Sequence, residues 1–184
     1  MSSFDRALGD FADDSRREKA QQTRQQLSDH AILATLSGNF LGTLVELAES
    51  RSPIVLITRG GSHHRGAIVA VGTDVVALAP DLEGKRILLA IDAIEAIRGP
   101  GISTGRAVDD VSDGVDLAAL LDQFGEDSSR VALLTSGANR LMGRILGVGV
   151  DQLTLRLDGL DGQDGEADAV TVSLAAIDEV VIEP

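Results

Sequence analysis

The sequence has no cysteine, tyrosine or tryptophan, and phenylalanine occurs only four times in 184 residues. Without cysteine the chain has no disulfide, no thiolate nucleophile and no cysteine-ligated zinc site. No run of about 18 apolar residues occurs, so no segment is predicted to span a membrane. The opening stretch MSSFDRALGDFADD lacks the apolar centre of a signal peptide. These absences predict a cytoplasmic protein with an aliphatic core.

The negative charge of the chain lies mainly in its second half. The formal net charge is −13. Residues 101–184 carry five basic and 16 acidic residues, whereas the two signs are nearly balanced in residues 1–38 and in residues 39–100. A polyanion would therefore be repelled by the second half and would meet a nearly neutral first half.

The chain contains an internal duplication. Residues 39–78 align without a gap with residues 116–155 at an offset of 77, and twelve of the forty positions are identical. The alignment resumes at an offset of 83, after six extra residues in the stretch LDGLDGQDGEAD of the second copy. Self-similarity of this kind predicts two structural units built alike.

Each copy is predicted to be one helix followed by five short strands. Asn39 and Asp116 are good helix N-caps. Helical spacing predicts one buried face in each helix, formed by Phe40, Leu44 and Leu47 in the first copy and by Leu117, Leu121 and Phe124 in the second. In the first copy the strands are predicted at PIVLIT, HRGAIVAV, DVVALA, RILLAI and IEAI. Four glycines are predicted to be structural: Gly66 and Gly143 allow a bend or bulge in the second strand, and Gly72 and Gly149 supply a positive φ in tight turns.

This order of elements resembles the Sm-like fold of the Sm, LSm and Hfq proteins. The stretch GGSHHRGAIVAVGTD is similar to the first Sm motif, although Gly60 to Gly66 is one residue longer and Gly66 to Asp74 two residues longer than in that motif. The resemblance covers residues 39–98 and 116–183. It implies a mainly β protein with N-terminal helices (α+β), made of two tandem Sm/SH3-like five-stranded small barrels, each preceded by a helix. Another SH3-like barrel topology is the alternative.

The predicted domain organisation has four parts. Residues 1–38 form a helical N-terminal arm, which either packs on the barrels or docks on a partner. Residues 39–100 form the first barrel repeat. Residues 101–115 form a linker whose Gly/Ser/Asp-rich composition predicts a hinge. Residues 116–184 form the second barrel repeat with an acidic hairpin insertion.

The resemblance implies single-stranded RNA binding, but the residues that carry this activity in the family are not matched. The family places an Asn shortly after the motif's Asp, whereas Asp74 and Asp151 are followed by VVAL and QLTL. The Arg-Gly expected between the last two strands is replaced by Asp92-Ala93 in one copy and by two alanines in the other. The remaining candidates for nucleic-acid or anion contact form one cationic loop: Arg59, His63, His64 and Arg65. The alternative is a solvated polar loop.

Neither a metal site nor a catalytic site is predicted. The acidic residues of the insertion recur at nearly every third position, unlike the alternate ligands of an EF-hand, and so favour an acidic hairpin over a calcium site. These residues are Asp158, Asp161, Asp164, Glu166 and Asp168. No Walker, G-x-S-x-G or H-E-x-x-H motif occurs. We therefore expect no enzyme activity, no cofactor and no bound metal.

The sequence predicts an adaptor or assembly protein. The outer strands of a five-stranded unit have unpaired backbone groups, and two fused copies satisfy some of these by pairing with each other. One edge at each end then stays free to recruit more chains. The predicted function is a non-enzymatic module that acts through strand-edge and helix-mediated protein interactions, with a protein partner or as a homo-oligomer. The alternative is RNA binding by the cationic loop of the first repeat.

Overall fold

The structure is a computed structural model, and it describes residues 38–81, 84–102, 105–109, 111, 114–127, 129–161 and 167–183. Within these residues the chain is mainly β with two α-helices, which confirms the predicted class. The helical arm predicted for residues 1–38 lies almost wholly outside the described residues. The first half contains α2 (Phe40–Ser50), β1 (Ile54–Thr58), β2 (His63–Val71), β3 (Val75–Pro80), β4 (Arg86–Ala90), the 3₁₀ turn η1 (Ile91–Ala93) and β5 (Ile94–Arg98). The second half contains α3 (Leu117–Glu126), β6 (Arg130–Thr135), β7 (Arg140–Val148), β8 (Gln152–Asp161), β9 (Ala167–Ser173), η2 (Leu174–Ala176) and β10 (Ile177–Glu183).

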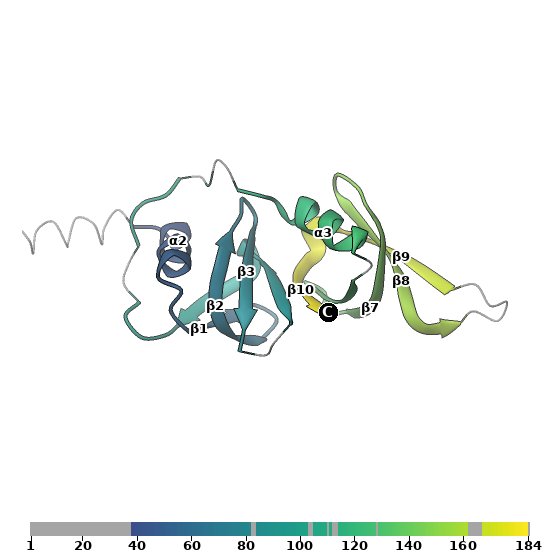
Figure 1. Cartoon of the computed structure of the whole chain (residues 1–184), viewed down its shortest axis with the longest axis horizontal. Coiled ribbons are helices and arrows are strands. Elements are labelled where there is room, and N and C mark those ends of the chain that lie inside the picture. Colours follow the sequence, from purple (N-terminus) through teal and green to yellow (C-terminus); the bar gives the residue numbers. More distant parts are fainter. Residues whose placement is uncertain are drawn as a thin grey trace, which may run out of the picture.

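The ten strands in the described part of the chain form one antiparallel sheet that is not closed. The strand order is β5-β1-β2-β3-β4-β10-β6-β7-β8-β9. In Figure 1, β10 lies on the side of the second half that faces the first half. Each half thus has its fifth strand beside its first, followed by the second, third and fourth in turn. The fourth strand of the first half pairs with the fifth strand of the second half, which joins the halves edge to edge. Strands β5 and β9 are the two outer edges of the sheet.

The local sequence explains both helices. The side chain of Asn39 accepts a hydrogen bond from the backbone N–H of Gly42 at 2.8 Å, and Asp116 accepts one from Ala119 at 2.8 Å, so both predicted N-caps are confirmed. Leu44 and Leu47 are buried in the first half, and Leu117 and Leu121 in the second. The prediction that Phe40 shares the buried face is wrong, because its side chain is 40% exposed. No helix in the described part of the chain is both long and apolar enough to cross a bilayer.

The core consists of two aliphatic clusters that interlock at the junction between the halves. One cluster lies under α2, around Leu44, Leu56 and Leu78. The other lies under α3, around Leu121, Leu133 and Leu155. Each helix packs on the second strand of its own half, α2 on β2 and α3 on β7. Leu88 and Val75 of the first half belong to the second cluster, and Val181 of the second half packs against the first. Burial therefore couples the halves.

The surroundings of Gly66 and Gly143 confirm the duplication. A Cβ on Gly66 would lie 2.2 Å from the carbonyl oxygen of Ala79, and one on Gly143 would lie 2.0 Å from that of Arg156, the equivalent residue. The bulges, however, do not lie at these glycines. The register shifts between Ile68 and Ala70 in β2 and between Ile145 and Gly147 in β7. The glycines instead let the next strand pass unusually close.

The turn glycines and the linker differ from their predictions. The N–H groups of Gly72 and Gly149 bond to the carbonyls of Val75 at 2.7 Å and Gln152 at 2.8 Å. Neither glycine has a positive φ, so this part of the prediction is wrong. A Cβ on Gly72 would instead meet the carbonyl oxygen of Val115 at 2.0 Å. The close approach of the linker explains this glycine.

The described part of the linker is held against α2. The N–H of Gly105 donates to the hydroxyl of Thr43 at 3.1 Å, and the N–H of Arg106 donates to the carboxylate of Glu46 at 2.8 Å. The guanidinium of Arg106 also lies 2.9 Å from Glu49. This part of the predicted hinge is therefore anchored to the first half.

Candidate functional site at the junction of the two halves

The junction begins with a short antiparallel ladder between β4 and β10. Its register places Val180 opposite Leu88 and Val181 opposite Ile87. The side chains of Val180 and Leu88 are 0% and 2% exposed. Both edges would otherwise present unpaired backbone groups to water, so the ladder satisfies hydrogen bonds and buries aliphatic surface together.

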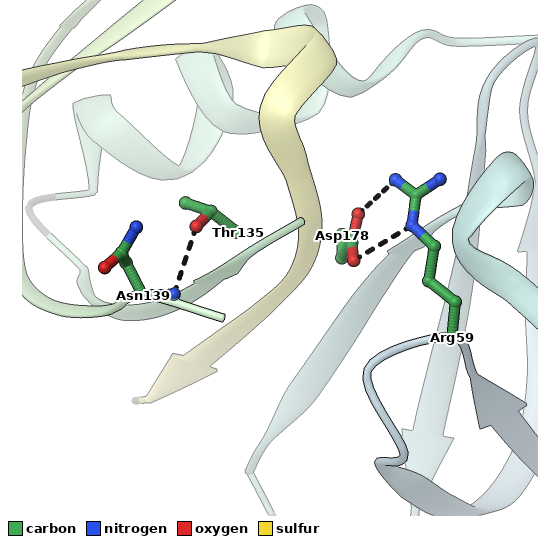
Figure 2. A network of polar contacts seen from close by, with 4 residues as sticks. All are labelled: Arg59, Thr135, Asn139 and Asp178. Atoms are coloured by element: carbon green, nitrogen blue, oxygen red, sulfur yellow. Dashed lines mark hydrogen bonds and ion pairs between the residues drawn. The ribbon is translucent and has the colours of Figure 1, made fainter. Parts of the chain in front are cut away.

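Three polar pairs cross the junction beside this ladder. Arg59 reaches Asp178 through two bonds, Nη2 to Oδ1 at 2.5 Å and Nε to Oδ2 at 3.2 Å, and the Asp178 side chain is only 2% exposed (Figure 2). His64 Nε2 lies 3.0 Å from Glu179 Oε2, and Lys85 Nζ lies 3.0 Å from Glu183 Oε1. In each pair the nitrogen comes from the first half and the carboxylate from β10. The pairs therefore match one strand edge to the other.

The pair of His64 and Glu179 is the one in which both side chains are buried, each 11% exposed. The two atoms lie within ion-pair distance but lack the geometry of a regular hydrogen bond, and neither has another hydrogen-bond partner. Burial raises the pKa of Glu179, but the neighbouring His64, together with Ser62 and Arg140, outweighs burial, so this pKa lies below its ordinary value of 4.5. The folded state therefore favours the carboxylate form.

The lowered pKa of Glu179 predicts a pH-dependent contribution to stability. A carboxyl group with a depressed pKa in the folded state stabilises the fold above its unfolded pKa, and this contribution is lost as the pH falls through the folded pKa. The difference in unfolding free energy between the wild type and Glu179→Gln should thus shrink as the pH falls below about 4.5. Urea unfolding at a series of pH values measures this difference. A difference that grows as the pH falls below about 4.5 would contradict the assignment.

The cationic loop predicted from the sequence is divided by the structure. Arg59 and His64 face β10, as described above. Arg65 lies 3.4 Å from Asp81 in an exposed pair, which contributes little to stability. His63 is exposed on β2. Three of the four side chains thus have a carboxylate neighbour within the chain, and the four do not converge on one anion site.

Sequence reasoning missed the carboxylates that face this loop. A comparison of the two copies could have indicated these carboxylates. At the aligned positions the second copy has Ser136, Leu141 and Asp168 in place of Arg59, His64 and Lys85. The first copy has Glu95, Ala96 and Pro100 in place of Asp178, Glu179 and Glu183. The three nitrogen-bearing side chains are therefore specific to one copy, and two of their three acidic partners are specific to the other.

A cavity of about 550 Å³ opens beside Arg59 at the same junction. The carboxylates that line it are those of Asp74, Asp92, Asp116 and Asp151. Two of them cap α3: the N–H of Leu117 donates to Asp74 at 2.9 Å, and that of Ala119 to Asp116. The cavity is therefore acidic overall, which disfavours an anionic ligand.

No family model matches the chain, and no curated protein matches it in sequence. Over the residues that the structure describes, no three His, Asp or Glu side chains lie close enough together to hold a metal ion. Residues 162–166 of the acidic insertion, including Asp164 and Glu166, lie outside the described residues. Asp158, at its start, lies 2.6 Å from Arg130.

Proposed function

We propose that the chain is a non-enzymatic assembly module that binds other proteins through its free strand edges. We further propose that each half is a small barrel of the Sm/SH3-like type, with five strands covered by its helix. The observation that carries the proposal is the ladder between β4 and β10, because it is an edge-to-edge contact between two units of the same design. A unit that pairs in this way inside the chain has the means to do so between chains.

The free edge at β9 has backbone groups available for such a contact. The N–H of Leu174 donates to the carbonyl of Asp151, and pairing between β8 and β9 stays in register from Leu174 back to Val170. Because bonded and non-bonded pairs alternate in an antiparallel ladder, the N–H of Thr171 points away from β8. An unpaired strand edge is a template for another strand.

The polar contacts of the first repeat support this role over RNA binding. The guanidinium of Arg59 and the ring of His64 are held by β10, and Arg65 lies beside Asp81. RNA would have to compete with these carboxylates at a junction that already carries an acidic cavity. These carboxylate neighbours make the loop a poor surface for RNA.

Blocking the backbone of β9 is expected to abolish assembly. Thr171→Pro removes the outward N–H and leaves the bonded pairs with β8 intact, since proline is tolerated on edge strands. Thr171→Ala is the matched control: both variants lose the 3.3 Å hydroxyl contact with Thr154, but the alanine keeps the N–H. Light scattering should show the wild type and Thr171→Ala rising with concentration from 19.2 kDa to multiples of it. Thr171→Pro should stay at the mass of one chain.

Two outcomes would contradict this proposal. One is a wild-type chain that keeps its single-chain mass over the whole concentration range. The other is a Thr171→Pro variant that assembles as well as Thr171→Ala does. Circular dichroism of each variant shows whether the sheet is intact, so that loss of assembly is separated from loss of fold.

A further inference from the structure

A groove of about 530 Å³ lies along the free edge of the second half. It is lined by the turn between β6 and β7 and by β9, including Thr135, Ser136, Leu141, Thr171 and Val172. Their equivalents in the first half are Thr58, Arg59, His64, Leu88 and Leu89. Arg59 and His64 contact β10, and Leu88 and Leu89 pair with it. The groove in the second half is therefore equivalent to the site in the first half that β10 occupies.

The two grooves have walls of the same construction. In the second half the N–H of Asn139 donates to the hydroxyl of Thr135 at 3.3 Å (Figure 2). In the first half the N–H of Ser62 donates to the hydroxyl of Thr58 at 3.2 Å. The third strand supports the fourth in the same register in both halves. The groove beside β9 is thus shaped for an extended strand, as its counterpart is.

The side chains of the second groove disfavour a strand like β10. Leu141 occupies the position of His64, so the carboxylate of a second Glu179 would meet an apolar side chain in place of the imidazole, although Arg140 also lines the groove. Burying the carboxylate against this apolar side chain is costly. Asp168 occupies the position of Lys85, which contacts Glu183 in the internal junction. The carboxylates of Asp168 and of a second Glu183 would therefore face each other. Ser136 replaces the guanidinium that binds Asp178. The occupant must therefore lack acidic groups at the positions equivalent to Glu179 and Glu183.

The other free edge of the same chain, β5, meets these requirements. Its residues align with those of β10, with Glu95 in place of Asp178 and Ala96 in place of Glu179. Ala96 suits the apolar Leu141, and the Ser136 hydroxyl can donate a hydrogen bond to Glu95. Arg98 would lie opposite Val170, diagonally next to Asp168, within reach of a long side chain.

We infer that the groove beside β9 receives β5 of a second copy of this chain, with Ala96 opposite Val172, Ile97 opposite Thr171 and Arg98 opposite Val170. This inference rests on the proposed function, since it names the partner of the free edge. Chains then link head to tail in one direction. The contact is weaker than the internal junction, because Thr171 replaces the buried Leu88. The linkage between chains is therefore reversible, whereas the internal junction is permanent.

The absence of cysteine makes the register directly testable. A tagged Ile97→Cys chain is mixed with an untagged Thr171→Cys chain and oxidised mildly. Opposite residues in a bonded antiparallel pair have Cα atoms about 5.5 Å apart, which suits a disulfide. The heterodimer should form in large excess over either homodimer. The control pairs Thr171→Cys with Val69→Cys, an exposed apolar position on β2, and should give only the level of random collision.

A charge reversal provides a second measurement. Arg98→Glu or Asp168→Lys alone should weaken assembly several-fold, and the double variant should restore it. The inference is overturned if the heterodimer does not exceed the Val69→Cys control, or if the double variant is weaker than both single variants. If assembly is then still abolished by Thr171→Pro, the strand-edge function stands with another partner strand. If assembly is unaffected by Thr171→Pro, the proposed function fails as well.

Discussion

Gly143→Ala is expected to lower the free energy of unfolding by about 3 kcal/mol, the upper part of the range for overpacking. The added Cβ would lie 2.0 Å from the carbonyl oxygen of Arg156 and 2.8 Å from its carbon. Both atoms belong to the backbone of β8 and are held by its pairing with β7 and β9. No side-chain rotation can relieve this contact, so the strands must separate.

Gly147→Ala is the matched control on the same strand. Nothing lies within 4 Å of the position where its Cβ would be placed, and its equivalent in the first half is already an alanine, Ala70. Its effect should be within about 0.5 kcal/mol of zero, as for an open surface position. Urea unfolding of both variants measures the contrast. Equal stabilities of Gly143→Ala and Gly147→Ala would show that β7 and β8 do not approach as the structure has them.

His64→Leu should be the most damaging single change at the junction, with a loss of about 3 kcal/mol, the lower end for breaking a buried pair. It leaves the Glu179 carboxylate buried without the imidazole, the neighbour that lowers its pKa most. The double variant His64→Leu/Glu179→Ala should recover most of the loss. It places at these positions the residue types that the chain has at the equivalent positions, as in Leu141 and Ala96, so no charge of this pair stays buried.

The double-mutant cycle separates this explanation from simple loss of packing. If the polar pair matters as a pair, the double variant is more stable than His64→Leu alone, and the coupling is large. Glu179→Ala alone should cost less than His64→Leu, because it leaves an imidazole ring rather than a buried carboxylate. Strict additivity of the two single effects would contradict the assigned role of the pair.

The elements and their repetition were predictable from the sequence because their causes are local. Asn39 and Asp116 cap helices through their own side chains, and strand composition with intervening glycines marks the strands. Predictions from the local sequence failed where backbone groups distant in the chain determine the conformation. The local sequence predicted a bend or bulge at Gly66 and Gly143 and a positive φ at Gly72, but the bulges lie elsewhere and the φ is not positive. At all three glycines, a carbonyl oxygen of another segment lies where a Cβ would be. The local sequence likewise placed Phe40 in the core.

The cationic residues of the candidate site could be predicted from the sequence, but their carboxylate partners could not. The sequence alone marked Arg59 and His64 as unusual, because they belong to a cationic loop whose counterpart in the second copy has no histidine. It could not show that Asp178 and Glu179 lie opposite them, since 119 residues separate Arg59 from Asp178 in the chain. A cationic loop whose partners cannot be identified in the sequence suggests an anion-binding site. Because Asp178 and Glu179 lie opposite the loop in the structure, the loop is instead interpreted as part of an internal contact.

The sequence by itself determined that the chain is two copies of one helix-and-five-strand unit, since periodicity, caps and the offset of 77 residues are all written in neighbouring residues. The tertiary structure alone decided which edges meet. Edge choice depends on matching side chains across strands that are far apart in the chain, and every strand offers the same backbone groups. The ladder of β4 with β10, with its three polar pairs, leaves β5 and β9 as the outer edges of the sheet.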